Sequence, residues 1–382
     1  MSGIYIHIPF CRRKCHYCNF FSLASLKYKD RFLNALNEEL FIRKNYLDDT
    51  PVNSVYIGGG TPSLLKASEI QDILEELRKY FSLSDDCEIT LEANPDDINT
   101  DILKEYRSVG INRLSIGIQS FFDDDLSYLN RIHSGKDAEE SILLAREAGF
   151  SNLSLDLIYG IPTLTEEKWR KNLEKAFSLD VPHISAYSLT VEPKTALDQL
   201  IRQKKLTGPE EENMLGHFRI LLQMMKEKGF EHYEISNFCK NGFYSRHNSM
   251  YWNGGSYLGL GPSAHSYNGT SRQWNISSLV QYIDQISRQD IFFESEELTP
   301  GQKYNEYVMV SLRTMWGCDS RKILNDFGEE AEKWFIVQVA RYLELGYVFE
   351  EKGVYFLTDE GKLFADGIAS DLFLEPQKSA ER

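Results

Sequence analysis

Short β-type runs alternate with helical patterns through the first half of the 382-residue chain, and this alternation restricts the fold to the parallel α/β class. Apolar residues at i, i+3 and i+4 mark the helices between the runs. The predicted strands are Ile4–Ile8, Val52–Ile57, Glu88–Ala93, Arg113–Ile118, Leu153–Ile158 and His183–Leu189. The helical candidates include Tyr28–Tyr46, Ser68–Tyr80, Asp137–Ala148 and Glu166–Phe177. The sequence therefore predicts a partial barrel of six β/α units.

Three cysteines follow the first predicted strand directly, in a C-x3-C-x2-C spacing. They are Cys11, Cys15 and Cys18. Thiolates so close in sequence, on one short loop, can bind a single metal centre. A [4Fe–4S] cluster is commonly held by four cysteines, so a set of three leaves one iron free to bind a small molecule. The spacing therefore predicts an iron–sulfur cluster with one open iron.

Zinc and disulfides fit the cysteine pattern less well. Structural zinc sites usually use two separated ligand pairs, and no second C-x2-C pair is present, although His16 would complete a Cys3His set. Six cysteines in 382 residues are sparse, and the N-terminus does not resemble a secretion signal, so we expect a reducing cytoplasmic location. Cys87, Cys239 and Cys318 are isolated in sequence and are predicted to be buried structural thiols.

Composition limits the partners that such a chain can have. The formal net charge of −15 disfavours broad electrostatic binding to nucleic acid, which needs clustered Lys and Arg. No apolar run approaches the ~20 residues that a membrane-spanning helix requires. The 21 Tyr and 22 Phe are numerous enough to line a pocket for a flat aromatic ligand, although aromatic residues more often fill cores.

The second half of the chain differs in pattern from the first. A helical stretch near Glu210 to Lys228 leads to a region rich in glycine and aromatic residues, Tyr244 to Tyr267, which is typical of functional loops over a scaffold. After Pro300, amphipathic helices precede two short predicted strands, Tyr347–Glu350 and Val354–Leu357, that turn at Lys352-Gly353. This order resembles a winged helix.

A chain of this length is expected to hold two or three domains. We predict a barrel domain over residues 1–235, a connecting region of loops over 236–300 and a smaller, mostly helical, winged-helix-like domain over 301–382. The last segment holds 10 basic and 15 acidic residues, so a packing or lid role is favoured over DNA binding.

Six motifs occur in a fixed order along the chain. They are YIHIPFC (5–11), the three-cysteine set, GGGTPS (58–63), EANP (92–95), RLSIGIQSF (113–121) and DLIYGIP (156–162). In this order they resemble the radical S-adenosylmethionine (SAM) superfamily, and specifically its coproporphyrinogen III dehydrogenase-like branch. The resemblance extends almost from end to end. It implies that SAM binds the open iron through its amino and carboxylate groups and is split there to a 5′-deoxyadenosyl radical.

The resemblance also implies a set of SAM-binding residues. Glycines let the backbone approach the methionyl amine closely, since they carry no side chain. The implied residues are Gly59, Gly60 and Thr61 for the amine, Asp156 and Gln119 for the ribose, Arg131 for the carboxylate, Glu92 for the ammonium or ribose, and Tyr5 and Tyr17 beside the ligand. An ordinary turn at the glycines, a surface ion pair at Arg131 and core packing of the two tyrosines are the alternatives.

Two groups within this branch fit the sequence, and they differ in class. The dehydrogenases convert two propionates of coproporphyrinogen III to vinyl groups, and they typically carry a fourth cysteine and an N-terminal extension. Here Phe20 occupies the position of that cysteine, and ten residues precede Cys11. The heme chaperone group binds heme and delivers it to acceptor proteins. Residues 247–252, HNSMYW, match its H-N-x-x-Y-W motif.

The resemblance therefore favours a heme chaperone that carries a [4Fe–4S] cluster and SAM. It implies heme-accepting proteins, membrane-associated ones among the candidates, and an electron donor as partners. His247 is the implied axial heme ligand, and Tyr251 and Trp252 would supply a stacking wall. His265 is a second candidate, for which hydrogen bonding is expected. A dehydrogenase and a radical SAM methyltransferase of the same architecture remain alternatives, and no catalytic residue is assigned.

Overall fold

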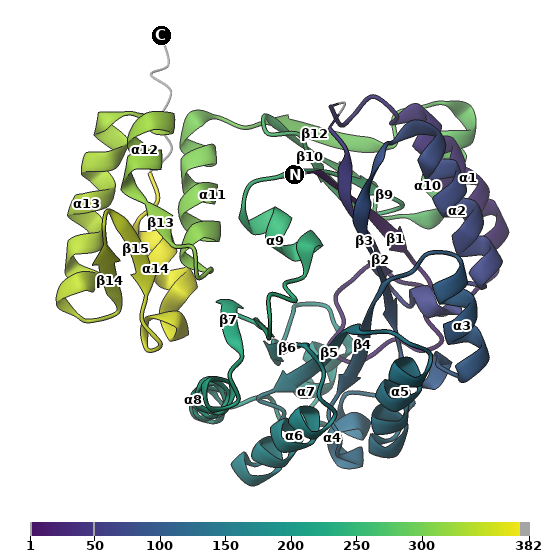
Figure 1. Ribbon diagram of the computed structural model, residues 1–382, viewed down its shortest axis with the longest axis horizontal. Helices are drawn as coiled ribbons and strands as arrows, with labels where there is room; N and C mark the ends of the chain where they lie inside the picture. The colour runs from purple at the N-terminus through teal and green to yellow at the C-terminus, as the bar shows by residue number, and fades with distance from the viewer. Residues whose placement is uncertain (1, 49, 375–382) are drawn as a thin grey trace.

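Six parallel strands form the centre of a mixed sheet (Figure 1). The computed structural model of the protein describes residues 2–48 and 50–374, so positions 375–382 of the predicted C-terminal domain lie outside the described residues. The six strands are β1 (Ser2–Ile8), β2 (Val52–Gly59), β3 (Leu83–Ala93), β4 (Arg113–Gln119), β5 (Asn152–Tyr159) and β6 (His183–Ser188). All six predicted strands are confirmed, with shifts of at most two residues at their ends, except that β3 begins five residues earlier than predicted.

Helices cover the outer side of these strands, as expected for a partial (β/α)6 barrel (Figure 1). They are α1 (Lys29–Ile42), α2 (Ala67–Tyr80), α3 (Thr100–Ser108), α4 (Asp123–Tyr128), α5 (Gly135–Glu147) and α6 (Glu166–Ser178). The four predicted helices correspond to α1, α2, α5 and α6. Two of them begin at side-chain caps, since Ser134 accepts from the Asp137 N–H and Thr165 accepts from the Lys168 N–H.

The sheet continues beyond the six parallel strands at both ends, to twelve strands among the described residues. After β6 come α7 (Ala196–Arg202) and α8 (Glu211–Glu227), and then β7 (Glu231–Glu234) and β8 (Asn237–Cys239), which add antiparallel strands next to β6. At the other end β9 (Ser256–Leu260) pairs parallel with β1. The sheet then ends with β10 (His265–Tyr267), β11 (Ser271–Asn275) and β12 (Phe293–Glu297), with α10 (Leu279–Arg288) between the last two.

The prediction of loops over Tyr244 to Tyr267 is wrong for much of that region. It contains a short helix, α9 (Arg246–Trp252), and the strands β9 and β10. The glycines permit close packing of ordered backbone here: a Cβ at Gly259 would lie 2.0 Å from the His265 carbonyl oxygen. Figure 1 shows α9 on the inner side of the sheet, between the barrel and the C-terminal helices.

The C-terminal part has its own hydrophobic cluster, formed by residues from Tyr304 to Leu372. Its elements are α11 (Pro300–Leu312), β13 (Cys318–Asp319), α12 (Ser320–Phe327), α13 (Glu329–Glu344), β14 (Val348–Glu351), β15 (Val354–Leu357), the 3-10 helix η3 (Gly361–Phe364) and α14 (Ala365–Asp371). The winged-helix-like order is confirmed. The turn between β14 and β15 uses Lys352 and Gly353, both with positive φ, as a two-residue hairpin requires. The predicted boundaries at 235 and 300 remain predictions.

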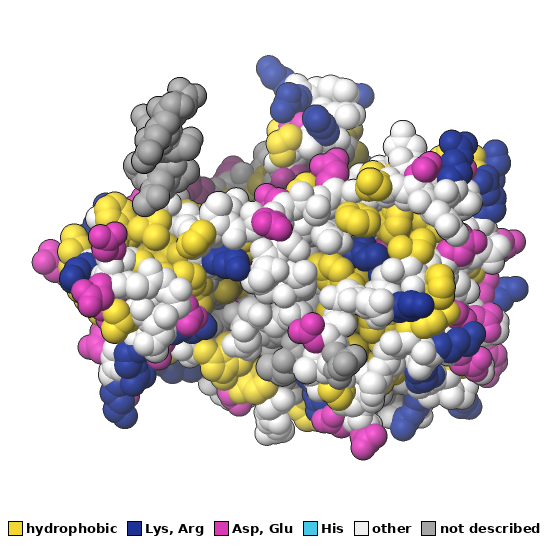
Figure 2. All heavy atoms as spheres, turned by 90° about the horizontal axis from the view of Figure 1, so that it is seen from above, with side chains coloured by type: hydrophobic (Ala, Val, Ile, Leu, Met, Phe, Trp, Pro, Cys, Tyr) yellow, Lys and Arg dark blue, Asp and Glu magenta, His cyan; other side chains and the backbone are white. Residues whose placement is uncertain are grey.

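The isolated cysteines Cys87, Cys239 and Cys318 are buried free thiols, as predicted. Within residues 2–48 and 50–374, no helix has the length and apolarity needed to cross a membrane. Basic and acidic side chains are interspersed on the face seen in Figure 2, which also shows small hydrophobic areas among them.

Candidate functional site

A cavity of ≈ 990 Å³ opens on the inner side of the barrel, at the carboxyl ends of the parallel strands. The structure brings together there every residue predicted for the cluster and for SAM except Tyr5. The lining residues from that prediction are Cys11, Cys15, Cys18, Tyr17, Gly59, Gly60, Thr61, Glu92, Gln119, Arg131 and Asp156. We call this the cluster cavity. Distant sequence motifs meet here because the carboxyl ends of parallel strands lie at one edge of a sheet.

Backbone hydrogen bonds fix the cysteine loop at both of its ends. The Leu23 N–H donates to the Pro9 carbonyl at 2.8 Å, and the Cys11 N–H donates back to the Leu23 carbonyl at 3.0 Å. Within the loop, the Cys18 N–H donates to the Cys15 carbonyl at 3.4 Å. The three cysteines therefore lie on a loop whose two ends are joined by backbone hydrogen bonds.

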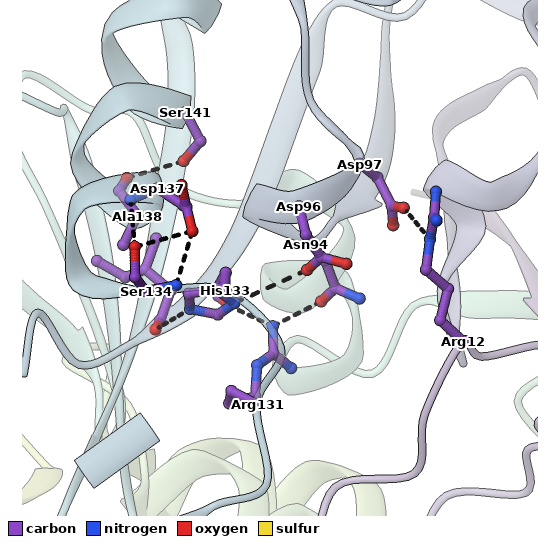
Figure 3. A network of polar contacts seen from close by, with 12 residues as sticks. Arg12, Asn94, Asp96, Asp97, Arg131, His133, Ser134, Asp137, Ala138 and Ser141 are labelled. Atoms are coloured by element: carbon purple, nitrogen blue, oxygen red, sulfur yellow. Dashed lines mark hydrogen bonds and ion pairs between the residues drawn. The ribbon is translucent and has the colours of Figure 1, made fainter. Parts of the chain in front are cut away.

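Neighbouring elements hold the same loop from outside. The His16 N–H donates to the Leu129 carbonyl at 3.1 Å, and the Asn130 side chain donates to the Lys14 carbonyl at 2.9 Å. Arg12 pairs with Asp97 at 2.7 Å, which ties the loop to the 3-10 helix η2 (Pro95–Asp97) after β3 (Figure 3). The loop is thus held by contacts from η2 and the segment after α4 as well as at its own ends.

Arg131 lies directly against the cysteine loop. Its Nη1 is 3.5 Å from Cys15 Sγ, and its Nη2 donates to Asn94 Oδ1 and to the Gly117 carbonyl, both at 2.7 Å. Figure 3 shows Arg131 extended toward Asn94, with His133 beside it. A guanidinium in this position stabilises a thiolate or a bound carboxylate by charge-assisted hydrogen bonds. It is not a surface ion pair, which was the alternative for this residue.

Glu92 and Asp156 place two carboxyl groups in the cluster cavity. Glu92 accepts from the Tyr56 hydroxyl at 2.8 Å and from the Gly59 N–H at 3.1 Å. Burial raises the pKa of Glu92 to about 7. The hydrogen bond from Tyr56 acts in the opposite direction and lowers the pKa, but its effect is smaller. Burial likewise raises the pKa of Asp156 to about 6, and Ser115 donates to this carboxylate at 3.2 Å. Both groups titrate near neutral pH.

The glycine motif packs tightly against β1. Gly59 has φ +108, and a Cβ there would lie 2.6 Å from the His7 ring. A Cβ at Gly60 would lie 2.5 Å from the Phe10 carbonyl oxygen. Both positions therefore exclude other residues for reasons of packing as well as of ligand access. Thr61 accepts a 3.2 Å hydrogen bond from Asn94 through its hydroxyl.

Gln119, Tyr17 and Tyr5 occupy different kinds of position. Gln119 ends β4 with φ 64, a left-handed conformation that turns its side chain into the cluster cavity. Tyr17 lines the same cavity from the cysteine loop. Tyr5 instead lines a second cavity, with its hydroxyl 3.1 Å from His7 Nδ1.

That second cavity, of ≈ 1150 Å³, lies between the barrel and the C-terminal domain. All three predicted heme residues line it: His247, Tyr251 and Trp252. His247 Nδ1 lies 2.9 Å from Ser54 Oγ, and its Nε2 lies 2.7 Å from the Tyr251 hydroxyl. Burial lowers the pKa of His247 to about 3, so the imidazole is neutral. A neutral ring can ligate iron once Nε2 gives up its hydrogen bond. His265, the second candidate, lines this cavity as well.

The two cavities share part of their walls. The shared lining residues are Asn19, Phe20, Tyr56, Glu92, Tyr187 and Asn248. Tyr56 also stacks on His247, with ring centroids 5.2 Å apart and an interplanar angle of 30°. Tyr56 therefore contacts both Glu92, through its hydroxyl, and His247, through its ring.

The C-terminal domain closes the cluster cavity on one side through η3 and the start of α14. Arg313 joins it to the barrel by ion pairs to Glu234, at 3.4 Å, and to Asp366 within the domain, at 2.6 Å. Lys362 Nζ lies 3.1 Å from His232 Nδ1 on β7, and Arg219 pairs with Glu360 at 3.0 Å. The junction is polar, as in interfaces between domains that move relative to each other.

Sequence reasoning missed several lining residues. Asn94 forms hydrogen bonds with both Arg131 and Thr61. It lies inside the EANP motif, so the motif could have identified it as a residue of the site. Arg113, a buried cation on β4, also lies inside a quoted motif and lines the cluster cavity. Arg272 and Lys303 of the second cavity belong to no local motif, and no signal in the sequence marks them.

The fold and the cluster cavity define a protein of the radical SAM type. Residues 5–176 match the family model described as the Radical SAM superfamily. The solved structure of coproporphyrinogen III oxidase (HemN) from Escherichia coli, a radical SAM enzyme, has the same fold. The two structures align over 97% of this chain and 90% of that one, with a TM-score of 0.84 and 24% sequence identity. A [4Fe–4S] cluster and SAM are the cofactors of this superfamily.

Sequence relatives define the family more closely. The heme chaperone HemW of Bacillus subtilis (strain 168) is 34% identical over 371 residues, which cover 96% of this chain and 98% of that protein. The heme chaperone HemW of Escherichia coli (strain K12) is 32% identical over 380 residues, which cover 97% and 98%. The chain belongs to the HemW family of radical SAM proteins.

The cysteine loop fits the cluster that this superfamily carries. All three thiols line one cavity, and Arg131 directs an N–H group at one of them. Among the described residues, no three His, Cys, Asp or Glu side chains converge closely enough to hold one metal ion. His16 Nδ1 lies 2.9 Å from the Tyr128 carbonyl oxygen, and a cluster with several irons can span more widely spaced thiolates than a single metal ion can.

Proposed function

We propose that this chain is a heme chaperone, which binds heme in the second cavity and delivers it to acceptor proteins. The observation that carries this proposal is the second cavity itself. Its size suits a large ligand, and its walls include the H-N-x-x-Y-W helix α9 together with Tyr5, Tyr56, Tyr257 and Tyr267. Relatives named heme chaperone HemW, similar over nearly the whole chain, support the same function.

His247 is our candidate for the axial heme ligand. Its imidazole is neutral and its ring orientation is fixed by Ser54 and Tyr251, as is usual for a histidine that binds a metal. Tyr251 and Trp252 flank it on α9 and line the same cavity. Binding of iron would replace the hydrogen bond between His247 Nε2 and the Tyr251 hydroxyl, while the contact of Nδ1 with Ser54 would persist.

For the cofactors, we propose that Cys11, Cys15 and Cys18 hold the [4Fe–4S] cluster with Arg131 beside Cys15. When bound, the cluster supplies an open iron for SAM and an electron for its cleavage. The residues of this chain that would bind SAM are Tyr17, Gly59, Gly60, Thr61, Glu92, Gln119, Arg131 and Asp156. Tyr5 stays a candidate for the same set, although its side chain lines the second cavity, because Glu92 of the set lines that cavity as well.

Phe20 distinguishes this chain from the dehydrogenases of the branch. It stands where they carry a fourth cysteine, its side chain is 62% exposed, and it lines both cavities. A phenyl ring at this position adds apolar surface between the two cavities and brings no additional thiolate. This favours binding of a flat apolar ligand over decarboxylation.

The partners and the location follow from the same proposal. A chaperone needs a heme-accepting protein, with membrane-associated ones among the candidates, and a reducible cluster needs an electron donor. We propose the cytoplasm as the compartment, because the cluster thiolates must stay reduced. We further propose that residues 1–235 bind the cofactors, that 236–300 supply the heme helix and that 301–382 close the site.

The test is a heme titration of the anaerobically reconstituted protein, followed by absorbance, with a coproporphyrinogen III turnover assay on the same sample. Stoichiometric heme uptake without turnover is the expected result. Turnover to protoporphyrinogen IX without retained heme would contradict the proposal and assign the chain to the dehydrogenases. Detection of a methylated product would instead indicate a methyltransferase.

A further inference from the structure

The helix α11 of the C-terminal domain forms one side of the second cavity. The residues of α11 and its C-terminal end that line it are Lys303, Glu306, Tyr307, Val310, Ser311 and Thr314. Their spacing of three and four positions places them on one face of the helix. The charged residues lie in its N-terminal half, and the uncharged residues follow them, so this wall changes in polarity along its length.

Further charged residues gather around the N-terminal half of α11. Arg272 on β11 pairs with Glu306 through Nη2 at 2.9 Å. Lys322 on α12 lies over the Tyr307 ring, 5.4 Å from its centroid, and pairs with Asp326 at 2.5 Å. Three cations and two carboxylates therefore meet at this end of the cavity.

The aromatic residues of α9 lie toward the other end of α11. Arg313, which follows Leu312 at the end of the helix, lies 5.6 Å from the ring centroid of Trp252. Lys303 and Arg313 are ten residues apart, or about 15 Å at 1.5 Å per helical residue. The α11 side of the cavity is thus charged near the N-terminus of the helix and lies close to Trp252 at its C-terminal end.

Two of the cations have donors free for a ligand. Among the described residues, no carboxylate lies within ion-pair distance of Lys303 Nζ. Arg272 uses Nη2 for Glu306, while its buried Nε has no hydrogen-bond partner in the described part of the chain. Its Nη1 has no partner among the described residues either, and the side chain is 40% exposed, so guanidinium N–H groups are available to an acceptor in the cavity.

We propose that Lys303 and Arg272 form a carboxylate clamp that binds the propionate groups of heme and orients the macrocycle with its ring toward α9. This inference rests on the proposed function. Heme has two carboxylates on one edge of an apolar ring, and Lys303 and Arg272 are cations with donors available in a cavity that is otherwise rich in aromatic side chains. Arg272 can donate from Nη1 to a propionate while its Nη2 keeps the ion pair with Glu306.

The experiment compares ferric heme with its dimethyl ester, which keeps the ring and the iron but removes both charges. Both ligands are titrated into the reconstituted full-length protein. The wild-type protein is expected to bind heme more tightly than the diester. Lys303→Gln and Arg272→Gln are each expected to weaken heme binding about tenfold and to leave binding of the diester unchanged. Lys303→Arg should restore the preference.

Lys333→Gln is the matched control, because Lys333 is an exposed lysine on α13 that does not line the cavity. Equal affinity of the wild-type protein for heme and for the diester would overturn the clamp and leave the proposed function standing. Equal weakening of both ligands by the two glutamine variants would also overturn it, since Lys303 and Arg272 would then act on the ring or the iron and not on the propionates. Failure of the wild-type protein to bind either ligand would overturn both the clamp and the proposed function.

Discussion

The Tyr56 hydroxyl donates a 2.8 Å hydrogen bond to Glu92, and both residues belong to the wall that separates the cluster cavity from the second cavity. Tyr56 also stacks on His247. A change in the charge of Glu92 on the SAM side therefore acts on a residue in contact with the proposed heme ligand. The two sites are therefore linked directly, through the one side chain of Tyr56.

The affinity for SAM should depend on pH through Glu92. Its pKa is raised to about 7, mainly by burial, and the ionised form is the one that accepts hydrogen bonds from the amino group or the ribose hydroxyls of SAM. SAM binding is therefore expected to strengthen as pH rises from about 6 to 8. Tyr56→Phe removes a hydrogen bond that stabilises the ionised form, so the midpoint should move up by about 0.7 pH units.

Equilibrium dialysis of SAM against the reconstituted protein over this pH range measures the effect. Tyr106→Phe is the matched control, because the Tyr106 hydroxyl donates to the Ser63 and Leu65 carbonyls and does not line the cavity. Identical midpoints in the wild-type protein and Tyr56→Phe would show that Glu92 does not control SAM binding.

The reduction potential of the cluster should depend on Arg131. Its Nη1 lies 3.5 Å from Cys15 Sγ, and a positive charge beside a cluster favours the reduced state. Arg131→Gln is therefore expected to make the potential more negative, whereas Arg131→Lys should lie between this variant and the wild-type protein. A redox titration followed by electron paramagnetic resonance measures it.

Arg12→Gln provides the comparison for that titration. Arg12 is in the same loop, next to Cys11, but its side chain is 56% exposed and pairs with Asp97. Water screens an exposed charge, so this variant should leave the potential nearly unchanged. A shift of equal size in Arg12→Gln and Arg131→Gln would contradict the role of Arg131.

Heme affinity should respond oppositely to changes at His247 and Tyr251. His247→Ala removes the proposed ligand and should abolish the histidine-ligated heme spectrum while the cluster remains bound. Tyr251→Phe frees His247 Nε2 from its 2.7 Å hydrogen bond and should strengthen heme binding about fivefold. Absorbance titrations of both variants measure this, and an unchanged spectrum in His247→Ala would rule out His247 as the ligand.

The barrel and its site were largely predictable because their signals are local. Each strand is a short apolar run, and the motifs GGGTPS and EANP follow or end strands that the sequence already places. The rule that carboxyl ends of parallel strands meet at one edge was enough to bring Cys11, Glu92 and Asp156 into one cavity.

The second cavity was not predictable in the same way. Tyr5 was expected beside SAM, yet its strand β1 pairs with β9, from residues 256–260, and its side chain faces α9. Arg272 and Lys303 line the same cavity because α11 lies beside the end of the sheet, where Arg272 pairs with Glu306. Such contacts depend on tertiary packing, for which neither periodicity nor motif spacing provides a signal.

The stability of the protein should depend on pH through His232, at the junction between the barrel and the C-terminal domain. Its Nδ1 lies 3.1 Å from Lys362 Nζ and its Nε2 lies 3.0 Å from the Ile235 carbonyl. The neutral ring thus accepts from Lys362 and donates to Ile235. Burial, together with the charge of Lys362, lowers the pKa of His232 to about 3, although Asp359 acts in the opposite direction.

Because the unfolded chain takes up a proton at His232 near pH 6.5 and the folded chain does not, acid favours unfolding. The contribution is fully present above about pH 6.5 and is lost by about 1.4 kcal/mol per pH unit below it. His232→Gln retains a donor and an acceptor but does not titrate. Its free energy of unfolding should fall less steeply than that of the wild-type protein between about pH 6.5 and 5, as measured by urea unfolding. Parallel pH profiles would show that His232 is already protonated at the junction, and Lys362 would then have to lie farther from it in solution.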